Sequence, residues 1–197
     1  MKISAVPSGT GRVYLWCKDG TRDDINQRDL TGTGKWNKSG SPYFNINLTE
    51  EQARELFNAD WRVKKRGKDM KQLNKRGEPG KWVNSPDLDA DLEQFNYILE
   101  PRVSYTGINP CRIIRIIPGK EQRELFFNSP DRATDISILN NDVWMKWKAV
   151  IRSWRNPDDG IITGYLEKLW VEVMQNEFDE EYADLPVYKG TEGLEDE

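Results

Sequence analysis

Two long runs of alternating residues, separated by a turn signal, constrain the fold of this chain more than any other feature. The runs cover residues 143–154 and 164–174, and residues 156–160 between them read Asn-Pro-Asp-Asp-Gly. Pro, Asp and Gly are typical turn residues, and two alternating runs joined by a turn predict a β-hairpin. A helix is the alternative for the first run, because its apolar residues also fit one helical stripe. The turn favours the hairpin.

Shorter strand-like runs occur along the rest of the chain, and one segment predicts a capped helix. Residues 12–18 and 42–48 alternate, and residues 111–117 are rich in β-branched side chains. Thr49 and Gln52 form a capping box, which predicts a short helix to about Asn58. We also expect strands at residues 61–65, 95–105 and 124–127, and a turn or one short helix at 134–141. The chain is therefore predicted to be mainly β and predominantly antiparallel, and closing into a small barrel would hide its sheet edges.

Charge is divided unevenly along the chain. Residues 177–197 hold nine acids and one base, so this acidic tail carries −8 and, of the total of −4, leaves +4 on residues 1–176. Residues 62–81 hold nine bases and two acids, and they overlap a stretch at 67–94 with few apolar residues. We interpret residues 67–94 as a flexible basic insertion in a domain at 1–176, followed by the tail. Such separation suggests a surface for polyanions, with a solvated loop and a solubilising tail as the alternative.

The residue types present exclude several kinds of chemistry. The sequence has no His, which excludes His-based catalysis and His-containing metal sites. Cys17 and Cys111 are too few for a Cys-only zinc site, and both lie in apolar runs, so buried free thiols are expected, with a single disulfide bridge as the alternative. The chain has no phosphate-binding or dinucleotide motif and no run of 18 apolar residues. We expect a cytoplasmic protein that is not an enzyme, with no cofactor, no metal site and no membrane contact.

The first long run combines aromatic rings and cations on one side. If residues 143–154 form a strand, that side presents Trp144, Lys146, Lys148, Arg152 and Trp154. Residues 12–18 also combine aromatic rings and cations on one side, and the second long run adds Lys168 and Trp170 to the candidate surface. Rings stack on bases and cations follow phosphates, so such a face is typical of a surface for single-stranded nucleic acid. Packing in the core is the alternative for each Trp, and we expect it for two others, Trp61 and Trp147.

Two further basic segments complete the set of candidate DNA-binding residues. The Gly-flanked loop around Trp36 is expected to be exposed, although its ring could instead fold back on the barrel. Residues 62–66 begin the basic stretch, which would act as an electrostatic funnel. The candidates are Trp144, Lys146, Lys148, Arg152, Trp154, Lys168, Trp170, Lys35, Trp36, Lys38, Arg62, Lys64, Lys65 and Arg66.

Several motifs follow one another in a recognisable order between residues 30 and 185. They are Gly-Lys-Trp-Asn at 34–37, Tyr-Phe-Asn-Ile at 43–46, Asp-Trp-Arg-Val-Lys at 60–64, Gly-Ile at 160–161, Gly-Tyr-Leu-Glu-Lys-Leu-Trp-Val at 164–171 and Phe-Asp-Glu-Glu-Tyr-Ala-Asp at 178–184. In this order they resemble a family of bacteriophage single-stranded-DNA-binding proteins from replication modules. The resemblance implies an oligonucleotide-binding (OB-like) antiparallel β-barrel and an acidic C-terminal tail.

These observations lead to one expected function and two alternatives. We expect a protein of a phage replication or recombination module that binds single-stranded DNA without sequence preference in the host-cell cytoplasm. The acidic tail is hypothesised to compete with DNA for the groove and to recruit replication or recombination proteins, and a homo-oligomer is compatible with the sequence. The first alternative is a phage accessory or anti-defence protein that binds a host protein, which would make the rings and cations a protein interface. A metal-dependent nuclease is the second.

Overall fold

The computed structural model describes residues 2–4, 6, 11–17, 25–35, 37–65, 71–72 and 97–174. Strands dominate this part of the chain, which confirms the mainly-β class. The acidic tail at 177–197 and the insertion at 67–94, apart from residues 71–72, lie outside the described residues. The division of the chain into a domain, an insertion and a tail therefore stays a prediction.

The larger of two sheets has six strands. In spatial order they are β1 (Lys2–Ile3), β2 (Arg12–Cys17), β10 (Trp144–Arg155), β11 (Ile162–Val173), β8 (Arg112–Ile116) and β9 (Arg123–Leu125). Neighbours are antiparallel except β11 and β8, which run parallel. β10 and β11 form the predicted hairpin, so residues 143–154 are a strand and not a helix. Gly160 in its turn has a φ of 70°, a conformation that strains residues with a Cβ.

The smaller sheet has five strands, all paired antiparallel. Their spatial order is β3 (Ile25–Asp29), β4 (Tyr43–Leu48), β7 (Tyr97–Leu99), β5 (Val63–Lys65) and β6 (Lys71–Gln72). The sequence did not predict β3, and β7 covers only part of the strand expected at 95–105. Both segments interrupt their alternation with polar residues or proline, which weakens the period-2 signal.

The helix that follows β4 confirms the capping-box prediction. It is α1 (Glu50–Asn58), and the Thr49 side chain accepts from the Gln52 backbone N–H while the Thr49 N–H donates to Gln52 Oε1 at 3.1 Å. Ala53 and Leu56 on its apolar face are buried, which holds the helix against the smaller sheet. A short 3-10 helix, η3 (Ile136–Asn140), lies within the segment where a turn or short helix was expected.

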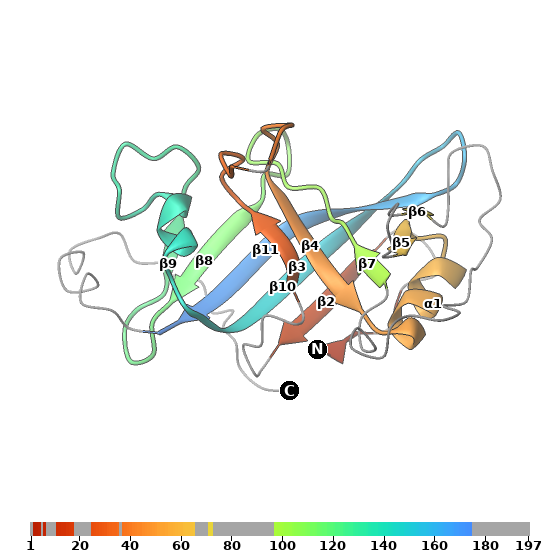
Figure 1. The fold of residues 1–197 in the computed structure, drawn as a ribbon, viewed down its shortest axis with the longest axis horizontal. Helices are drawn as coiled ribbons and strands as arrows, with labels where there is room; N and C mark the ends of the chain where they lie inside the picture. The colour runs from red at the N-terminus through yellow and green to blue at the C-terminus, as the bar shows by residue number, and fades with distance from the viewer. Residues whose placement is uncertain are drawn as a thin grey trace.

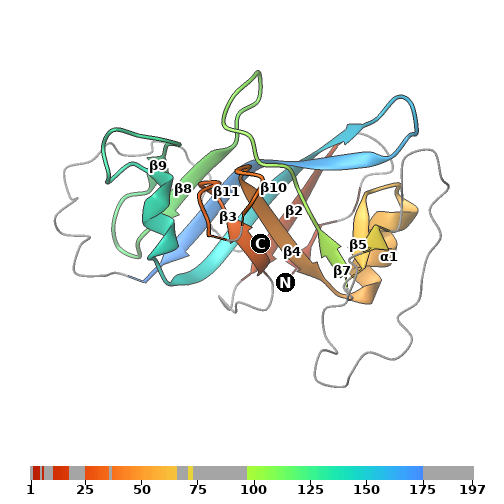
Figure 2. The ribbon, with the colours of Figure 1, turned by 45° about the horizontal axis from the view of Figure 1, so that its top comes forward.

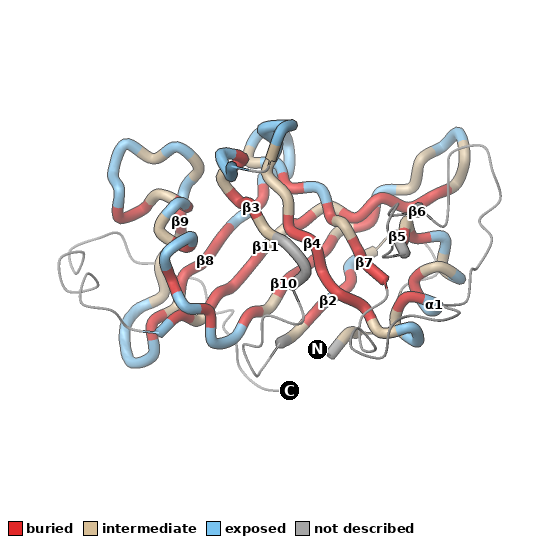
Figure 3. The backbone as a smooth tube through the Cα atoms, in the orientation of Figure 1, coloured by how far each residue is buried: buried red, intermediate tan, exposed pale blue. Residues whose placement is uncertain are grey.

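The two sheets pack face to face as two layers with the core between them (Figure 1). The Phe44 ring of β4 meets the Trp147 ring of β10 edge-on, with centroids 5.5 Å apart. The strands β4 and β11 are buried along most of their length, and β10 is buried along its middle (Figure 3). Trp61 and Trp147 are both fully enclosed, which confirms the expected core role of these two rings.

The sheets do not close into the expected barrel. Arg102 makes isolated bridges to Tyr43 and Tyr165, and these join the two layers after β7. In each sheet the described strands end at an outer strand, and three of these, β1, β6 and β9, have only two or three residues. Short outer strands offer little unpaired backbone to other chains. The edges therefore need less protection than a closed barrel would give.

A buried ion pair fixes the end of the larger sheet. Arg115 of β8 donates to both carboxylate oxygens of Asp142 at 2.8 and 2.9 Å, and the two side chains are 3% and 0% exposed. Arg112, three residues earlier, lies on the opposite side of β8 and donates to both oxygens of Glu124 near the surface. The two arginines therefore face opposite ways, as their odd spacing on a strand requires.

Cys111, directly before β8, is buried with a free thiol, as expected. Burial raises the pKa of this thiol well above its ordinary value, so the neutral form prevails. The side chain of Cys17 lies outside the described residues. In the described part of the chain, neither helix has the length and apolar character needed to cross a bilayer.

Candidate nucleic-acid interface

The side of the larger sheet that faces away from the core carries rings and cations in alternation. Strand register places them in rows across β2, β10, β11 and β8. The first row is Trp16, Lys148, Trp170 and Ile114, the second is Tyr14, Val150, Lys168 and Arg112, and the third is Arg12, Arg152 and Tyr165. We call these eleven residues the basic-aromatic face. Side chains from β2, from β8 and from the β10–β11 hairpin, three parts of the chain that are distant in sequence, thus share one surface.

Rings and cations of this face touch one another. Lys148 Nζ lies 5.4 Å from the centroid of the Trp170 ring and 5.9 Å from that of Trp16. Lys168 Nζ lies 4.6 Å from the same Trp170 centroid. Tyr14 and Trp16 stack on β2, with centroids 6.2 Å apart. Cation–π contacts of this kind hold lysine side chains over rings while their charge stays near the surface.

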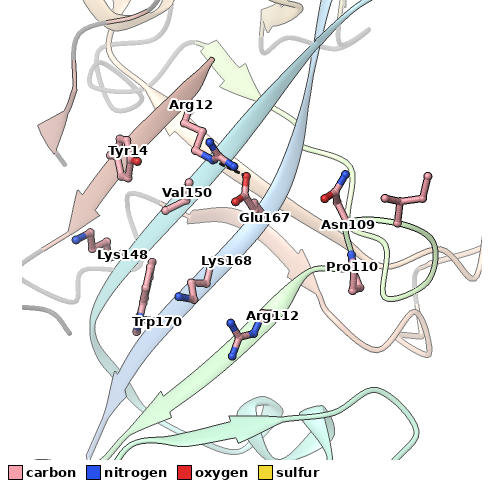
Figure 4. A pocket seen from close by; sticks show the side chains of 11 residues that line it. Arg12, Tyr14, Asn109, Pro110, Arg112, Lys148, Val150, Glu167, Lys168 and Trp170 are labelled. Carbon is pink, nitrogen blue, oxygen red and sulfur yellow. Dashed lines mark hydrogen bonds and ion pairs between the residues drawn. The ribbon is translucent and has the colours of Figure 1, made fainter. Parts of the chain in front are cut away.

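A pocket of about 620 Å³ opens on this face. Figure 4 shows Tyr14 and Lys148 on one side of it and Asn109 and Pro110 on the other. Its lining residues are Arg12, Tyr14, Ile108, Asn109, Pro110, Arg112, Lys148, Val150, Glu167, Lys168 and Trp170. Four of these are cations and one is an acid, so the pocket favours anionic ligands.

Acidic partners moderate the charge at two places on the face and at Lys146 beside it. Arg12 pairs with Glu167 at 2.8 Å, and this hydrogen bond raises the pKa of the Arg12 guanidinium. Arg112 Nε lies 2.7 Å from Glu124 Oε1, and Lys146 Nζ lies 3.4 Å from Glu172 Oε1. Exposed pairs of this type contribute little to stability. Phosphates can therefore compete for these cations at a small cost.

Trp144 does not lie on the basic-aromatic face, which corrects the sequence-based expectation. Met145 has no partner in the register between β10 and β11, because Trp144 pairs with Val173 and Lys146 with Glu172. This β-bulge puts Trp144 on the same side as Trp147. The Trp144 ring is only 7% exposed, stacks on Phe44 and donates its Nε1–H to the Leu139 carbonyl at 3.2 Å. Trp144 is therefore a core residue.

The remaining candidates on β10 and β11 lie on the outer side of the sheet, with different exposure. Trp154 is 45% exposed and available for stacking, whereas the Trp170 ring is only 2% exposed. Trp170 packs with Ile114 and Val150 and forms the floor of the pocket. Lys146 lies on this side of β10 but does not line the pocket.

The candidates outside β10 and β11 are not brought to the pocket. Lys35 and Lys38 are exposed on the loop between β3 and β4, and Trp36 between them lies outside the described residues. Lys64 belongs to β5 of the smaller sheet and pairs with Glu100, whereas Arg62 directly precedes β5 and its backbone N–H donates to the Ile162 carbonyl at 2.9 Å. The Lys65 side chain and all of Arg66 are outside the described residues.

Sequence reasoning missed Tyr165 and the loop at 106–110. Simple alternation would place Tyr165 and Lys168 on different sides of β11. In the structure Val150 pairs with Lys168 and Ile151 pairs with Leu166, so Glu167 is an extra residue without a partner in the register. This second bulge brings Tyr165 to the outer side, where its ring lies 5.5 Å from the Arg152 guanidinium carbon. No local signal in the sequence marks either bulge.

Asp29 holds the loop between β3 and β4 in one shape. Its carboxylate accepts from the backbone N–H groups of Thr31, Gly32 and Gly34 and from the Asn37 side chain, at 2.8 to 3.2 Å. A Cβ on Gly34 would come within 2.7 Å of the Asp29 Oδ2, and Gly32 has a φ of 73°. The two glycines are therefore required by the loop, and Lys35 and Lys38 sit on a preorganised hairpin tip.

The hydrogen bonds that Asp29 accepts in this loop are expected to make the stability of the protein depend on pH. Burial acts to raise the pKa of Asp29, but the hydrogen bonds from Asn37, Gly34, Thr31 and Gly32 outweigh it and hold the pKa below its ordinary value. A lowered folded-state pKa means that the carboxylate stabilises the fold above about pH 4 and loses this effect as the pH falls through the folded-state pKa. In urea unfolding at pH 7, Asp29→Asn should cost about 1.5–3 kcal/mol. The gap to the wild type should shrink toward pH 2.5, and a gap independent of pH would contradict this account.

Comparisons of the chain with protein-family models, with curated proteins and with solved structures found no match. Among the described residues, no group of three or more Cys, Asp or Glu side chains is placed to hold a metal ion. Function is therefore inferred from the basic-aromatic face and its pocket.

Proposed function

We propose that the protein binds single-stranded DNA on the basic-aromatic face, without sequence preference and without catalysing a reaction. The observation that carries this proposal is the placement of Lys148 and Lys168 on the Trp170 ring, beside the stacked Tyr14 and Trp16. Two positive groups at the floor of an open pocket suit a phosphate backbone, and rings around them suit unpaired bases. The proposal includes the phage replication or recombination role and the host-cell cytoplasm that the resemblance implies.

Single strands suit this face better than duplexes do. The rings that flank the pocket present flat surfaces, and every base has a π-face to stack on them. A duplex hides those faces inside its stack and offers only its backbone and grooves. The acidic tail, attached after β11, is proposed to compete for the same cations and to recruit partner proteins.

The two pocket lysines are the first variants to test. A Lys148→Gln/Lys168→Gln protein should bind a labelled oligonucleotide more weakly, and the slope of log K against log salt should become shallower by about 0.7 for each phosphate that the variant no longer binds. Fluorescence anisotropy over a salt series measures both quantities. The matched control is Arg54→Gln/Lys120→Gln, which also removes two exposed cations but leaves the face intact.

Four results would contradict the proposal. A flat salt response in the wild type would exclude phosphate contacts. Equal losses in the lysine variant and the control would show only a general charge effect. Binding without preference for longer single strands would favour the alternative in which the face docks a host protein, and cleavage of a single strand with a divalent metal would favour the nuclease.

A further inference from the structure

An apolar side chain stands at the tip of the loop that borders the pocket. Ile108 is 98% exposed, the largest exposure of any large apolar residue in the described part of the chain. Its neighbours Thr106, Gly107 and Asn109 are ordinary turn residues. The loop projects beyond the sheets between β7 and β8 (Figure 2). An isoleucine in this position forgoes all the stabilisation that burial would give it.

The base of the loop is rigid, so the tip is held in place. Cys111 N–H donates to the Ser104 carbonyl at 2.7 Å and closes the loop. Tyr105 stacks on Phe127 with centroids 4.7 Å apart, and its hydroxyl donates to the Leu30 carbonyl at 2.8 Å. Gly107 has a φ of 95°, which allows the chain to reverse at the tip. Ile108 therefore projects from an anchored loop and not from a loose one.

The tip lies where a bound strand would pass. Ile108, Asn109 and Pro110 form one wall of the pocket, and Lys148, Lys168 and Arg112 belong to the strands that form its floor and other wall. A strand whose phosphates lie on these cations would carry its bases past the loop. DNA-binding proteins insert apolar side chains, isoleucine among them, between neighbouring bases to unstack them.

We propose that Ile108 is an apolar wedge that enters between two bases of the bound strand and holds them unstacked. The inference rests on the proposed function and names the form of substrate that the face prefers, which is a strand whose bases are already unstacked. Insertion of the wedge makes the same contacts on any strand. On a stacked strand, however, the free energy needed to separate the stacked bases reduces the net free energy of binding. Oligo(dT), which stacks weakly, should therefore bind more tightly than oligo(dA) of equal length, and this difference reflects the stacking strength of the strand and not recognition of a base sequence.

The experiment uses the full chain and three probes: oligo(dT), oligo(dA), and a strand that carries 2-aminopurine, whose emission rises when its neighbours unstack. The wild type should brighten 2-aminopurine and prefer oligo(dT). Ile108→Ser should bind oligo(dT) about tenfold more weakly, narrow the preference over oligo(dA) and lose most of the brightening. Ile108→Leu should keep all three properties, and so should Val143→Ser, which removes a different exposed apolar side chain.

The outcomes separate the inference from the function on which it rests. If the wild type binds neither strand, both fall. If it binds but Ile108→Ser keeps the wild-type brightening and the same ratio of the two affinities, the wedge is wrong and single-strand binding stands. Because Ile108 contributes no buried surface, the serine variant should fold, and an unchanged unfolding midpoint would verify this.

Discussion

Replacing Asp142 with alanine is expected to lower the free energy of unfolding by about 3–5 kcal/mol. The variant leaves the Arg115 guanidinium buried at 3% exposure without the carboxylate that neutralises it. The cost reflects an uncompensated charge in the core and not the net value of the pair. Urea unfolding monitored by tryptophan fluorescence measures the change.

The chain supplies a matched control in the ion pair of a second arginine of β8. Glu124 also accepts two hydrogen bonds from one arginine, Arg112, but this pair lies near the surface with 45% and 24% exposure. Glu124→Ala should cost no more than about 1 kcal/mol. Equal costs for the two variants would contradict the assignment of burial as the cause. A double replacement, Arg115→Met with Asp142→Leu, should recover much of the loss, because it removes both charges together.

The second large effect is expected from two tryptophans of β10 that the sequence places on the same face. Trp144→Ala should cost about 3–5 kcal/mol of stability, because it empties a ring site packed on Phe44. Its folded fraction should bind single-stranded DNA as the wild type does. Trp154→Ala, at a site 45% exposed, should change stability by less than about 0.5 kcal/mol and weaken DNA binding by about 1–3 kcal/mol if the ring stacks a base.

Denaturant unfolding of both variants measures the change in stability, and oligonucleotide titration measures the change in affinity for DNA. Unchanged stability in Trp144→Ala would place that ring at the surface, against the bulge at Met145. Unchanged affinity in Trp154→Ala would show that the Trp154 ring does not stack on a base and that the stacking surface is limited to the pocket. The affinity of the folded Trp144→Ala protein also tests whether Trp144 affects DNA binding only by stabilising the fold.

Much of the fold was predictable because its signals are local. Alternation marks β2, with Val13 and Leu15 inward and Tyr14 outward, and side chains in a strand must alternate between its two faces. The capping box marks α1, since Thr49 and Gln52 satisfy backbone groups within one turn. Turn residues mark the β10–β11 connection. Lys148, Lys168 and Trp170 were also placed correctly on one face, because no bulge lies between them and their neighbours in the rows.

Local patterns were enough to establish the mainly-β class, the long hairpin, the capped helix and the mixture of rings and cations. Long-range packing settled which side Trp144 and Tyr165 occupy, that β8 joins β11 in parallel, and that two sheets stack without closing into a barrel. The division arises because register and pairing depend on strands far apart in the chain. A single extra residue, at Met145 or Glu167, reverses every side chain beyond it, and no neighbouring residue in the sequence records which strand will be opposite.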